Sequence, residues 1–371
     1  MNNKVVVRQC EKYEQEEINR LIPEIYRRAE GPSVRGKKVL VKPNILSDRI
    51  PGKAITTHPA IVEAVLAHLI EGEASSIQIG DSPAIERPGF TGSKSGIRQV
   101  ADKMGAEWVD FTRRRATIEA GGSKIAVVRE LLEADIVISL PKLKNHELLY
   151  FTGAIKNSMG FIPGFHKAKQ HALYRSRERF ARFLVDLAEV IAPHFFIIDG
   201  IVSMEGPGPA NGVPVKTGIL AGSVNPLALD IIASSVAGYR PEDIPTTAEG
   251  LRRQLWLSSI NEIEYDGPPA ESIVKSDFRR IAIGGNRNIS IQFIMNRIKP
   301  LRRFDKRPVI SRSLCISCGD CIRICPVDAL RYDSRSAGRV RLKDSSCIRC
   351  YCCSEVCPAG AITIRRKLFG D

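Results

Sequence analysis

The sequence lacks the segments that assign many proteins to a nucleotide-binding or radical class. It has no G-x-x-x-x-G-K-[ST] phosphate-binding loop. Its glycine-rich run at residues 206–212 is a poor dinucleotide-binding fingerprint, because Pro207 and Pro209 interrupt it. The C-x3-C-x2-C run of radical enzymes is missing as well. The chemistry therefore rests on other residues.

Membrane-spanning and export segments are also absent. No window of the 371 residues approaches the roughly 18 uninterrupted apolar residues of a membrane helix. Residues 1–4, Met-Asn-Asn-Lys, do not begin the apolar region of an export signal. The 43% apolar content is ordinary for a folded chain. We expect a cytoplasmic protein with a sizeable core and no membrane span.

Cysteine, in contrast, follows a repeated pattern. Eight of the 10 cysteines form two copies of C-x2-C-x2-C-x3-C-P, closed by Pro326 and Pro358. The eight are Cys315, Cys318, Cys321 and Cys325, then Cys347, Cys350, Cys353 and Cys357. This is the ligand pattern of bacterial-type ferredoxins with two 4Fe-4S clusters, in which the fourth Cys of each run binds the other cluster.

The expected ligand assignment is therefore crossed between the two runs. Cluster 1 takes Cys315, Cys318, Cys321 and Cys357, and cluster 2 takes Cys347, Cys350, Cys353 and Cys325. Disulfides do not fit a large chain without a secretory signal, and zinc has no use for the third Cys or the prolines. Cys10 and Cys352 lie outside the register and are not expected to be ligands. Because such clusters are oxygen-sensitive, we expect an anaerobic or low-oxygen cell.

The formal net charge of +14 raises the question of nucleic-acid binding. Residues 301–371 hold 15 Lys or Arg and 7 Asp or Glu. Two oxidised clusters with their thiolates bring about −4, so many of these cations balance cluster charge. The remaining basic patch is Arg297, Lys299, Arg302, Arg303, Lys306 and Arg307. Without interleaved aromatics or a helix-turn-helix pattern, it favours docking of a redox partner protein over specific nucleic-acid binding.

Strands and helices alternate before the cysteine runs. The apolar pattern predicts strands at residues 4–8, 38–41, 76–79, 107–111, 124–128, 134–140, 195–198 and 217–221. It predicts helices at 14–28, 57–70, 96–104 and 176–191, and one capped by Asn225. We therefore predict a three-layer α/β domain with a mostly parallel sheet at 1–290. A basic linker at 291–310 and a small α+β ferredoxin-type domain at 311–371 follow.

Polar residues follow several predicted strands directly. Ligands of open α/β sheets collect at the carboxyl ends of the strands, so these residues predict a cationic pocket for a carboxylate or phosphate. Any one of them alone would more often be solvated than functional. We expect catalytic roles for His146, Lys142 and Asp81. We expect substrate contacts from Lys42, Asn44, Lys144, Asn145, Lys156, Asp199 and Glu205. His58 is expected to begin a helix.

These motifs resemble those of the domain of unknown function 362 family. The matching segments are Val41-Lys42-Pro43-Asn44, Thr57-His58-Pro59, Gly80-Asp81-Ser82-Pro83, residues 140–146 (Leu-Pro-Lys-Leu-Lys-Asn-His), residues 156–160 (Lys-Asn-Ser-Met-Gly), Asp199-Gly200 and residues 204–209 (Met-Glu-Gly-Pro-Gly-Pro). The resemblance spans about residues 37–240 and implies the same architecture, in several members with a C-terminal ferredoxin. It implies no particular reaction.

Three functions are compatible with these residues. In the first, an oxidoreductase, the clusters relay electrons to an anionic substrate or cofactor at the strand ends. In the second, a non-enzymatic electron-transfer protein or subunit, the α/β domain docks a redox partner. In the third, the α/β domain performs non-redox chemistry and the clusters are structural or sensory.

Overall fold

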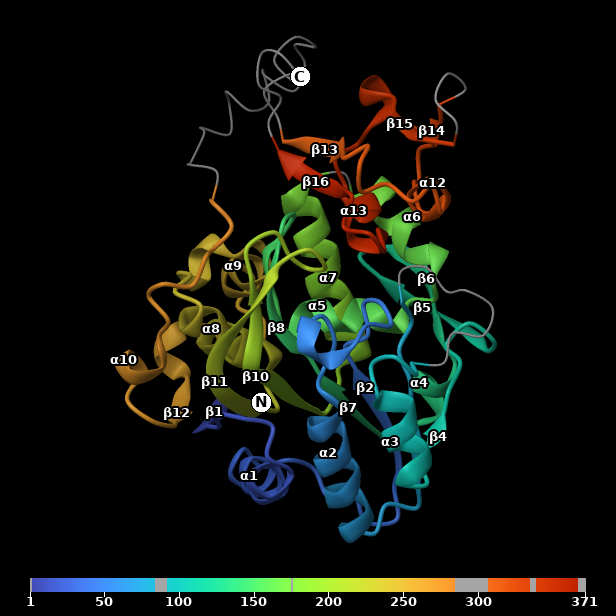
Figure 1. Ribbon diagram of the computed structural model, residues 1–371. Coiled ribbons are helices and arrows are strands. Elements are labelled where there is room, and N and C mark those ends of the chain that lie inside the picture. The colour runs from blue at the N-terminus through green and yellow to red at the C-terminus, as the bar shows by residue number, and fades with distance from the viewer. Residues whose placement is uncertain (1, 84–91, 175, 284–305, 334–337, 366–371) are drawn as a thin grey trace.

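A ten-stranded sheet forms the centre of the computed structural model, which describes residues 2–83, 92–174, 176–283, 306–333 and 338–365 (Figure 1). The strand order is β12-β1-β11-β10-β7-β2-β3-β4, with β8 beside β10 and β9 beside β8. The ladders are parallel except β1 with β11, β10 with β11 and β8 with β9. The strands are β1 (Lys4–Gln9), β2 (Lys38–Pro43), β3 (Ser76–Ile79), β4 (Glu107–Trp108), β7 (Ile136–Leu140), β8 (Lys142–His146), β9 (Tyr150–Thr152), β10 (Phe195–Glu205), β11 (Val213–Ser223) and β12 (Glu264–Asp266).

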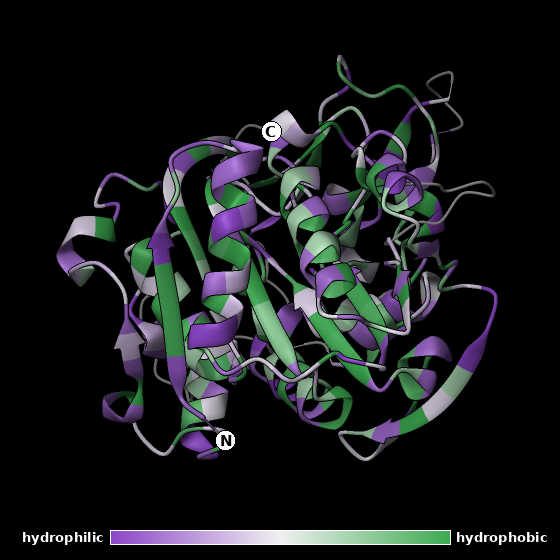
Figure 2. Cartoon of the chain, turned by 90° about the horizontal axis from the view of Figure 1, so that it is seen from below, coloured by the Kyte–Doolittle hydropathy of each residue, from purple (hydrophilic) through white to green (hydrophobic). Residues whose placement is uncertain are grey.

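Helices cover both faces of this sheet. Alternate residues of one strand point to opposite faces, so Val39 and Val41 of β2 pack in one apolar core and Leu40 packs in the other. The first core includes α1 (Gln15–Arg28), α2 (Pro59–Glu71) and α3 (Ile97–Lys103). The second includes α5 (Ala154–Asn157), α7 (Arg177–Ile191) and α8 (Pro226–Val236). Several central strands are correspondingly hydrophobic over most of their length (Figure 2).

Shorter elements complete the α/β unit. The helices are α4 (Glu130–Glu133), α6 (Phe165–Leu173), α9 (Pro245–Arg252) and α10 (Ala270–Ile273). The 3-10 turns are Pro51–Lys53, Ser158–Phe161, Pro241–Asp243 and Ile260–Glu262. A separate hairpin joins β5 (Arg115–Ala120) to β6 (Ser123–Val128). No helix in the described ranges is long and apolar enough to cross a membrane.

A small α+β unit sits on the α/β unit (Figure 1). It pairs β13 (Arg307–Ile310) with β16 (Ile362–Arg365), and β14 (Leu330–Tyr332) with β15 (Val340–Leu342). Its helices are α12 (Asp320–Arg323) and α13 (Cys352–Val356), with a 3-10 turn at Asp344–Ser346. Ile324 and Cys352 pack against Ala168 of α6, which joins the two units through an apolar contact.

The predicted fold class is confirmed, whereas several predicted segments differ. Residues 142–146, expected in a loop, form the buried strand β8. The strand expected at 107–111 ends at Trp108, and β6 pairs with β5 outside the main sheet. Residues 307–310, expected in the linker, are strand β13. Residues 291–305, with Arg297, Lys299, Arg302 and Arg303, lie outside the described residues.

Asp230 of α8 holds the start of α5. Its carboxylate accepts hydrogen bonds from the backbone N–H groups of Ala154 (2.5 Å) and Ile155 (3.1 Å). Gly153 precedes them because a Cβ there would lie 2.0 Å from Asp230 Oδ1. Burial raises the pKa of Asp230 to about 7, although the two N–H groups oppose this shift. The orientation of α5, which carries Lys156, thus depends on a carboxyl group that titrates near neutral pH.

We expect the free energy of unfolding to fall, relative to the variant Asp230→Asn, as the pH rises from about 4 to about 7. The folded-state pKa of about 7 exceeds the ordinary value of 3.8. The stabilising contribution of the protonated group is therefore complete below the unfolded pKa and lost as the pH rises through the folded pKa. Urea titrations of both proteins at several pH values measure this difference. A difference that stays constant over this range would contradict the prediction.

Candidate functional site

A buried ion pair lies where β2 and β3 end. Lys42 Nζ is 3.0 Å from Asp81 Oδ1, and the two side chains are 1% and 3% exposed. Asp81 also accepts hydrogen bonds from the backbone N–H of Ile45 (2.5 Å) and of Ser82 (2.8 Å). Burial lowers the pKa of Lys42, and the Asp81 carboxylate opposes this shift. The pair is therefore held in one geometry by backbone groups.

The segment after α5 closes around this pair. Asn157 Oδ1 accepts hydrogen bonds from Lys42 Nζ (2.7 Å) and Asn44 Nδ2 (2.9 Å). A Cβ on Gly160 would lie 2.0 Å from Lys42 Cε and 2.4 Å from Asp81 Oδ1. Only glycine lets the chain approach the ion pair this closely. Asn157 and Gly160 thus bring α5 against the ends of β2 and β3.

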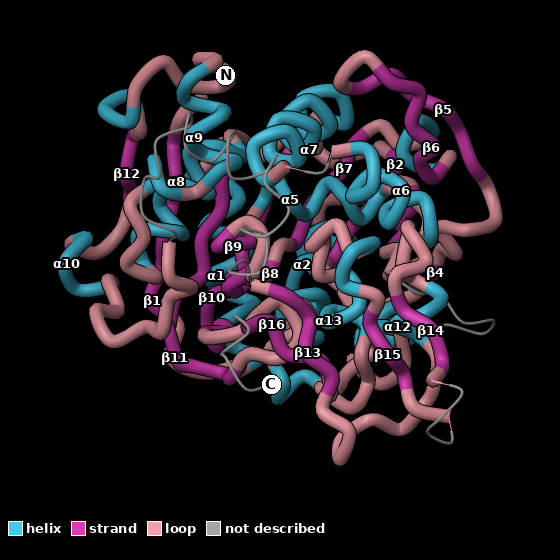
Figure 3. Tube along the Cα trace, turned by 90° about the horizontal axis from the view of Figure 1, so that it is seen from above, coloured by secondary structure: helices cyan, strands magenta, loops and turns pink. Residues whose placement is uncertain are grey.

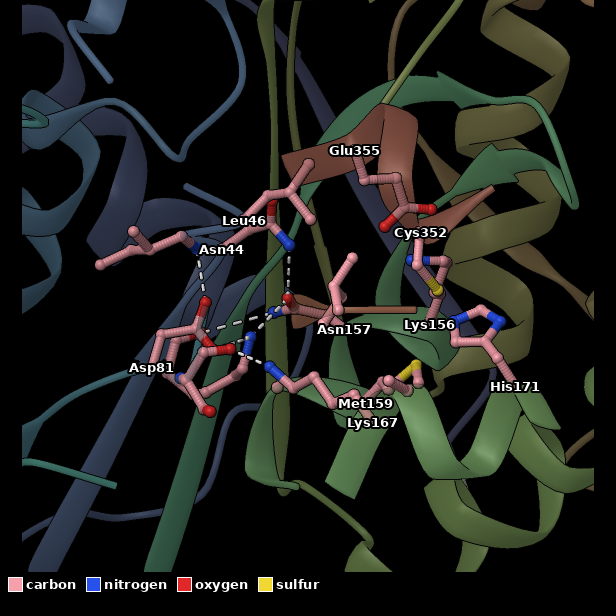
Figure 4. A pocket seen from close by; sticks show the side chains of 16 residues that line it. Asn44, Leu46, Asp81, Lys156, Asn157, Met159, Lys167, His171, Cys352 and Glu355 are labelled. Carbon is pink, nitrogen blue, oxygen red and sulfur yellow. Dashed lines mark hydrogen bonds and ion pairs between the residues drawn. The ribbon is translucent and has the colours of Figure 1, made fainter. Parts of the chain in front are cut away.

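These groups form one wall of a cavity of about 60 Å³ between the two units. Its α/β wall includes Lys42, Asn44, Ile45, Leu46, Asp81, Ser82, Lys156, Asn157, Met159, Gly160, Lys167, Ala168 and His171. The C-terminal unit contributes Ile324, Cys352 and Glu355. In Figure 4, Lys156, His171, Cys352 and Glu355 lie on one side, opposite Asn44 and Asp81. The site is therefore shared by both units.

Lys156 is a cation on the cavity wall without a partner. Its ammonium makes no hydrogen bond or ion pair with any residue that the structure describes. Burial lowers the pKa of Lys156, while Glu355, Cys352 and Asp81 oppose this shift. This half-buried donor is therefore free to bind a ligand that accepts a hydrogen bond.

Two further lysines bind neutral oxygen atoms beside the cavity. Lys144 Nζ donates to Asn44 Oδ1 (2.7 Å) and to the carbonyl of Ile55 (2.6 Å). Burial holds the pKa of Lys144 well below its ordinary value. Lys167 donates to the carbonyl of Ser82.

Among the described residues around the cavity, lysines outnumber carboxylates. The lysines are Lys42, Lys144, Lys156 and Lys167, and the carboxylates are Asp81 and Glu355. Lys42 is paired with Asp81, so the charge that an anion would offset is that of Lys156. The cavity therefore suits a small carboxylate or phosphate group.

His146 stands behind Glu355 and does not line the cavity. Its Nδ1 accepts hydrogen bonds from the backbone N–H groups of Leu148 (3.1 Å) and Leu149 (3.2 Å). The ring proton is therefore on Nε2. This Nε2 lies 3.2 Å from Glu355 Oε1, although neither atom completes a hydrogen bond. His146 thus lies next to Glu355 and does not reach the cavity itself.

Burial and neighbouring charges shift the pKa values of His146 and Glu355. Burial lowers the pKa of His146 to about 4, and Lys156 acts in the same direction. Burial raises the pKa of Glu355, but His146, Lys156 and His171 overcome this effect and lower it to about 2. Glu355 is therefore ionised and His146 neutral at pH 7.

Lys142 and Asp199 pair away from the cavity. Lys142 Nζ lies 2.7 Å from Asp199 Oδ2, and both side chains are fully buried. Asp199 also accepts hydrogen bonds from Tyr13 Oη (2.8 Å) and from the backbone N–H of His58 (2.9 Å), the residue that caps α2. The pair therefore ties α2 to β8 and β10.

Asn145 and Glu205 likewise hold loops together. Asn145 Nδ2 donates to the carbonyls of Arg279 (2.7 Å) and Gly206 (3.1 Å), and its Oδ1 accepts from Tyr239 (2.8 Å). Glu205 accepts from the backbone N–H of Arg279 (2.8 Å) and pairs with its guanidinium. Neither residue lines the cavity.

Five lining residues were not predicted from the sequence: Lys167, His171, Ile324, Cys352 and Glu355. None of them follows a strand of the main sheet, so the strand-end argument could not find them. They lie on or beside α6, α12 and α13. Only the docking of the two units brings them to the cavity.

Two further cavities, each of about 20 Å³, are lined by cysteines. The first cysteine cavity is lined by Cys315, Cys318, Cys321 and Cys357, and the second by Cys325, Cys347, Cys350, Cys352 and Cys353. All ten cysteines are free thiols. In the described ranges, no three His, Cys, Asp or Glu side chains converge on a single metal ion. Sulfurs spread around a cavity fit a multi-iron cluster better than one zinc ion.

The two cysteine runs also share their backbone conformation. Ser317 and Arg349 have left-handed φ angles at equivalent places, as do Gly319 and Tyr351. The backbone N–H groups of Ala329 and Ala361 donate to the sulfurs of Cys325 and Cys357, each at 3.2 Å. Such hydrogen bonds to sulfur are a feature of iron–sulfur sites and influence cluster potential.

Cys352 lines both the second cysteine cavity and the cavity that holds Lys156. The first cysteine cavity shares no lining residue with the Lys156 cavity. Cys352 is therefore the residue at which the second cysteine cavity meets the Lys156 cavity.

Comparisons with known proteins agree with the two units. The family model "Domain of unknown function (DUF362)" matches residues 39–235, more than half of the chain, and a 4Fe-4S dicluster domain model matches residues 314–361. Thylakoid-associated protein sll1697 of Synechocystis sp. (strain ATCC 27184 / PCC 6803 / Kazusa) is 36% identical over 215 residues, which cover 57% of this chain and 67% of that protein.

Two solved structures are similar at lower identity. The lactate racemase apoprotein from Thermoanaerobacterium thermosaccharolyticum is 13% identical with a TM-score of 0.43, over 62% of this chain and 57% of that one. A Thermotoga maritima protein is 16% identical with a TM-score of 0.32, over 54% of this chain and 52% of that one. The chain thus spans little more than half the length of either structure.

We expect Gly160→Ala to lower the free energy of unfolding by about 1–3 kcal/mol, because the new methyl group would overlap Lys42 and Asp81. Gly52→Ala is a matched control, since a Cβ there meets nothing within 4 Å. Anaerobic urea titration of both variants measures the effect. Equal stability of the two variants would show that the ion pair moves freely.

Proposed function

This chain belongs to the family described as Domain of unknown function (DUF362), and because its 4Fe-4S dicluster domain supports an iron–sulfur electron-transfer role, we propose that it is an oxidoreductase. In this proposal, two 4Fe-4S clusters supply electrons for a small anionic substrate or cofactor in the Lys156 cavity. A redox partner protein supplies or accepts electrons.

In this proposal, each cysteine cavity supplies the ligands of one cluster. Cluster 1 would be held by Cys315, Cys318, Cys321 and Cys357 of the first cysteine cavity, and cluster 2 by Cys347, Cys350, Cys353 and Cys325, which line the second cavity together with Cys352. When bound, such clusters supply one-electron transfer. Cys352 is not a ligand in this assignment.

One observation carries the proposal: Cys352 is part of both the second cysteine cavity and the wall of the lysine-rich cavity. An anion beside Lys156 would therefore lie next to the cysteines of cluster 2, with one side chain between them. The C-terminal unit also closes the cavity with Ile324 and Glu355. A redox role would explain why the cavity shares Cys352 with the second cysteine cavity and is closed by the C-terminal unit. A cavity unrelated to electron transfer would not need to lie beside these cysteines.

The residues of the cavity have separate roles in this proposal. Lys156 binds the anion and can pass it a proton, because its lowered pKa favours release. Asn44 and Lys42 line the anion site, and Asp81 fixes the position of Lys42. Lys144 supports Asn44 by a hydrogen bond. Lys142, Asn145, His146, Asp199 and Glu205 then stabilise the surrounding structure without touching the ligand.

We expect Cys353→Ala to lower the iron content of the anaerobically reconstituted protein, because a cluster ligand is lost. Cys352→Ala is the neighbouring control and should keep the iron content and visible absorbance of the unaltered protein. Iron analysis and absorbance spectra test both variants. Iron loss in Cys352→Ala would overturn the ligand assignment.

We expect Lys156→Met to weaken anion binding about 10- to 100-fold, since a hydrogen bond to a charged group contributes about 1.5–3 kcal/mol. Anaerobic calorimetry with inorganic phosphate and small carboxylic acids as probes measures the affinity. Lys124→Met, on the exposed hairpin strand β6, is the control and should bind as the unaltered protein does. Iron content should be equal in all three proteins.

Two results would contradict the proposed function. If Lys156→Met binds the probes as tightly as the unaltered protein does, the anion site does not lie in this cavity. If none of the probes binds to the unaltered protein, the chain is better described as an electron-transfer subunit whose α/β unit docks a partner.

A further inference from the structure

Three apolar side chains are exposed on the outer side of the first cysteine cavity. Leu314, Ile316 and Tyr332 are 54%, 65% and 54% exposed, and we refer to them as the outer patch. Ile316 lines the cavity of Cys315 and its neighbours. Tyr332 Oη donates to the carbonyl of Ser317, 3.3 Å away, which places Tyr332 against the segment that carries Leu314 and Ile316. Exposed apolar groups next to a cofactor site are typical of protein docking surfaces.

The exposed charges of this unit are almost all positive. Among its described residues, Asp328 is the exposed acid. The exposed bases are Arg312, Arg323, Arg331, Arg339, Arg341, Lys343 and Arg365. Arg323 is neutralised by Asp320, so most of the remaining positive charge faces solvent.

Arg331 and Arg341 are directly opposite each other on β14 and β15. Both side chains are exposed, and neither has an ion-pair partner among the residues that the structure describes. Like charges at opposite positions of an antiparallel pair are unfavourable. The hairpin therefore favours a negatively charged surface against it.

The hairpin and the lysine-rich cavity are at different ends of the C-terminal unit. Strands β14 and β15 lie on the side away from the main sheet (Figures 1 and 3). The second cysteine cavity faces the α/β unit, because Cys352 lines it and the Lys156 cavity together. The first cysteine cavity lies beside the outer patch through Ile316.

We propose that the outer patch and its arginines form the docking surface for a small acidic electron-transfer protein. Apolar contact at Leu314, Ile316 and Tyr332 lies beside basic residues, and an acidic partner is complementary to both. A second copy of this chain does not fit, because each copy carries +14 and would be repelled. The cluster that Cys315, Cys318, Cys321 and Cys357 would hold is then the one that exchanges electrons with the partner, and the second group of cysteines faces the anion. The passage of electrons toward the anion rests on the proposed function, whereas the docking surface does not.

Binding to two probes of opposite charge tests the docking surface. The probes are an acidic plant-type ferredoxin and the basic protein cytochrome c, each passed over the immobilised, anaerobically reconstituted full chain. The ferredoxin should bind, with an affinity that falls about tenfold from low to physiological ionic strength. Cytochrome c should not bind. Binding that is insensitive to salt, or equal for both probes, would overturn the proposal.

A double charge reversal localises the interaction. Arg331→Glu with Arg341→Glu should weaken ferredoxin binding about tenfold or more. The control, Arg27→Glu with Lys37→Glu, changes the net charge equally at exposed positions of the α/β unit, on α1 and before β2. It should bind within about twofold of the unaltered protein. If both variants bind ferredoxin equally weakly, the attraction comes from the net charge of the chain and not from this surface. If neither variant binds more weakly, the arginines merely balance cluster charge.

Leu314→Ser tests the apolar part of the surface. Leu314 does not line a cysteine cavity, so iron content should be unchanged. Its affinity for ferredoxin should fall severalfold at every salt concentration. If the affinity of Leu314→Ser for ferredoxin is unchanged, the outer patch is not part of the interface. If a DNA duplex competes fully with ferredoxin, the surface binds nucleic acid instead.

These measurements need no ligand in the Lys156 cavity. Loss of docking with intact anion binding would overturn this inference alone. Loss of anion binding with intact docking would overturn the proposed function alone.

Discussion

The ion pair between Lys42 and Asp81 is the interaction on which the site depends. Both groups are removed from water, and a buried pair is stable only when its remaining hydrogen-bonding capacity is satisfied. Asn157 and the backbone of Ile45 and Ser82 meet this need. These hydrogen bonds hold the ends of β2 and β3 and the segment after α5 close together. The cavity is a consequence of this closure.

The second constraint is the attachment of the C-terminal unit. Asn211, in the loop between β10 and β11, donates to the carbonyl (3.2 Å) and hydroxyl (3.0 Å) of Ser354 on α13. Glu355, the next residue, then faces His146 and the cavity. The same short helix also carries Cys352 and Cys353. One helix therefore fixes both the cysteines and the carboxylate relative to the lysines.

The residues predicted for the site divide into two groups for a physical reason. Lys42, Asn44 and Asp81, near the ends of β2 and β3, line the cavity together with Lys156 of α5. Lys142 comes after β7 and Asp199 lies within β10, but the two neutralise each other and therefore serve as an internal link. The sequence shows a charged residue at a strand end. It does not show whether the opposite charge comes from a ligand or from another strand.

The sequence by itself determined the class of this protein: the alternation of apolar strands and helices, the segments of the family and the two cysteine runs. Each of these is a local pattern, and local spacing decides strand, helix and ligand geometry. Only the tertiary structure decided that Cys352 and Glu355 complete a cavity begun by Lys42. Their meeting depends on the complementarity of two surfaces, to which residues distant in the chain contribute, and no spacing within either segment encodes it.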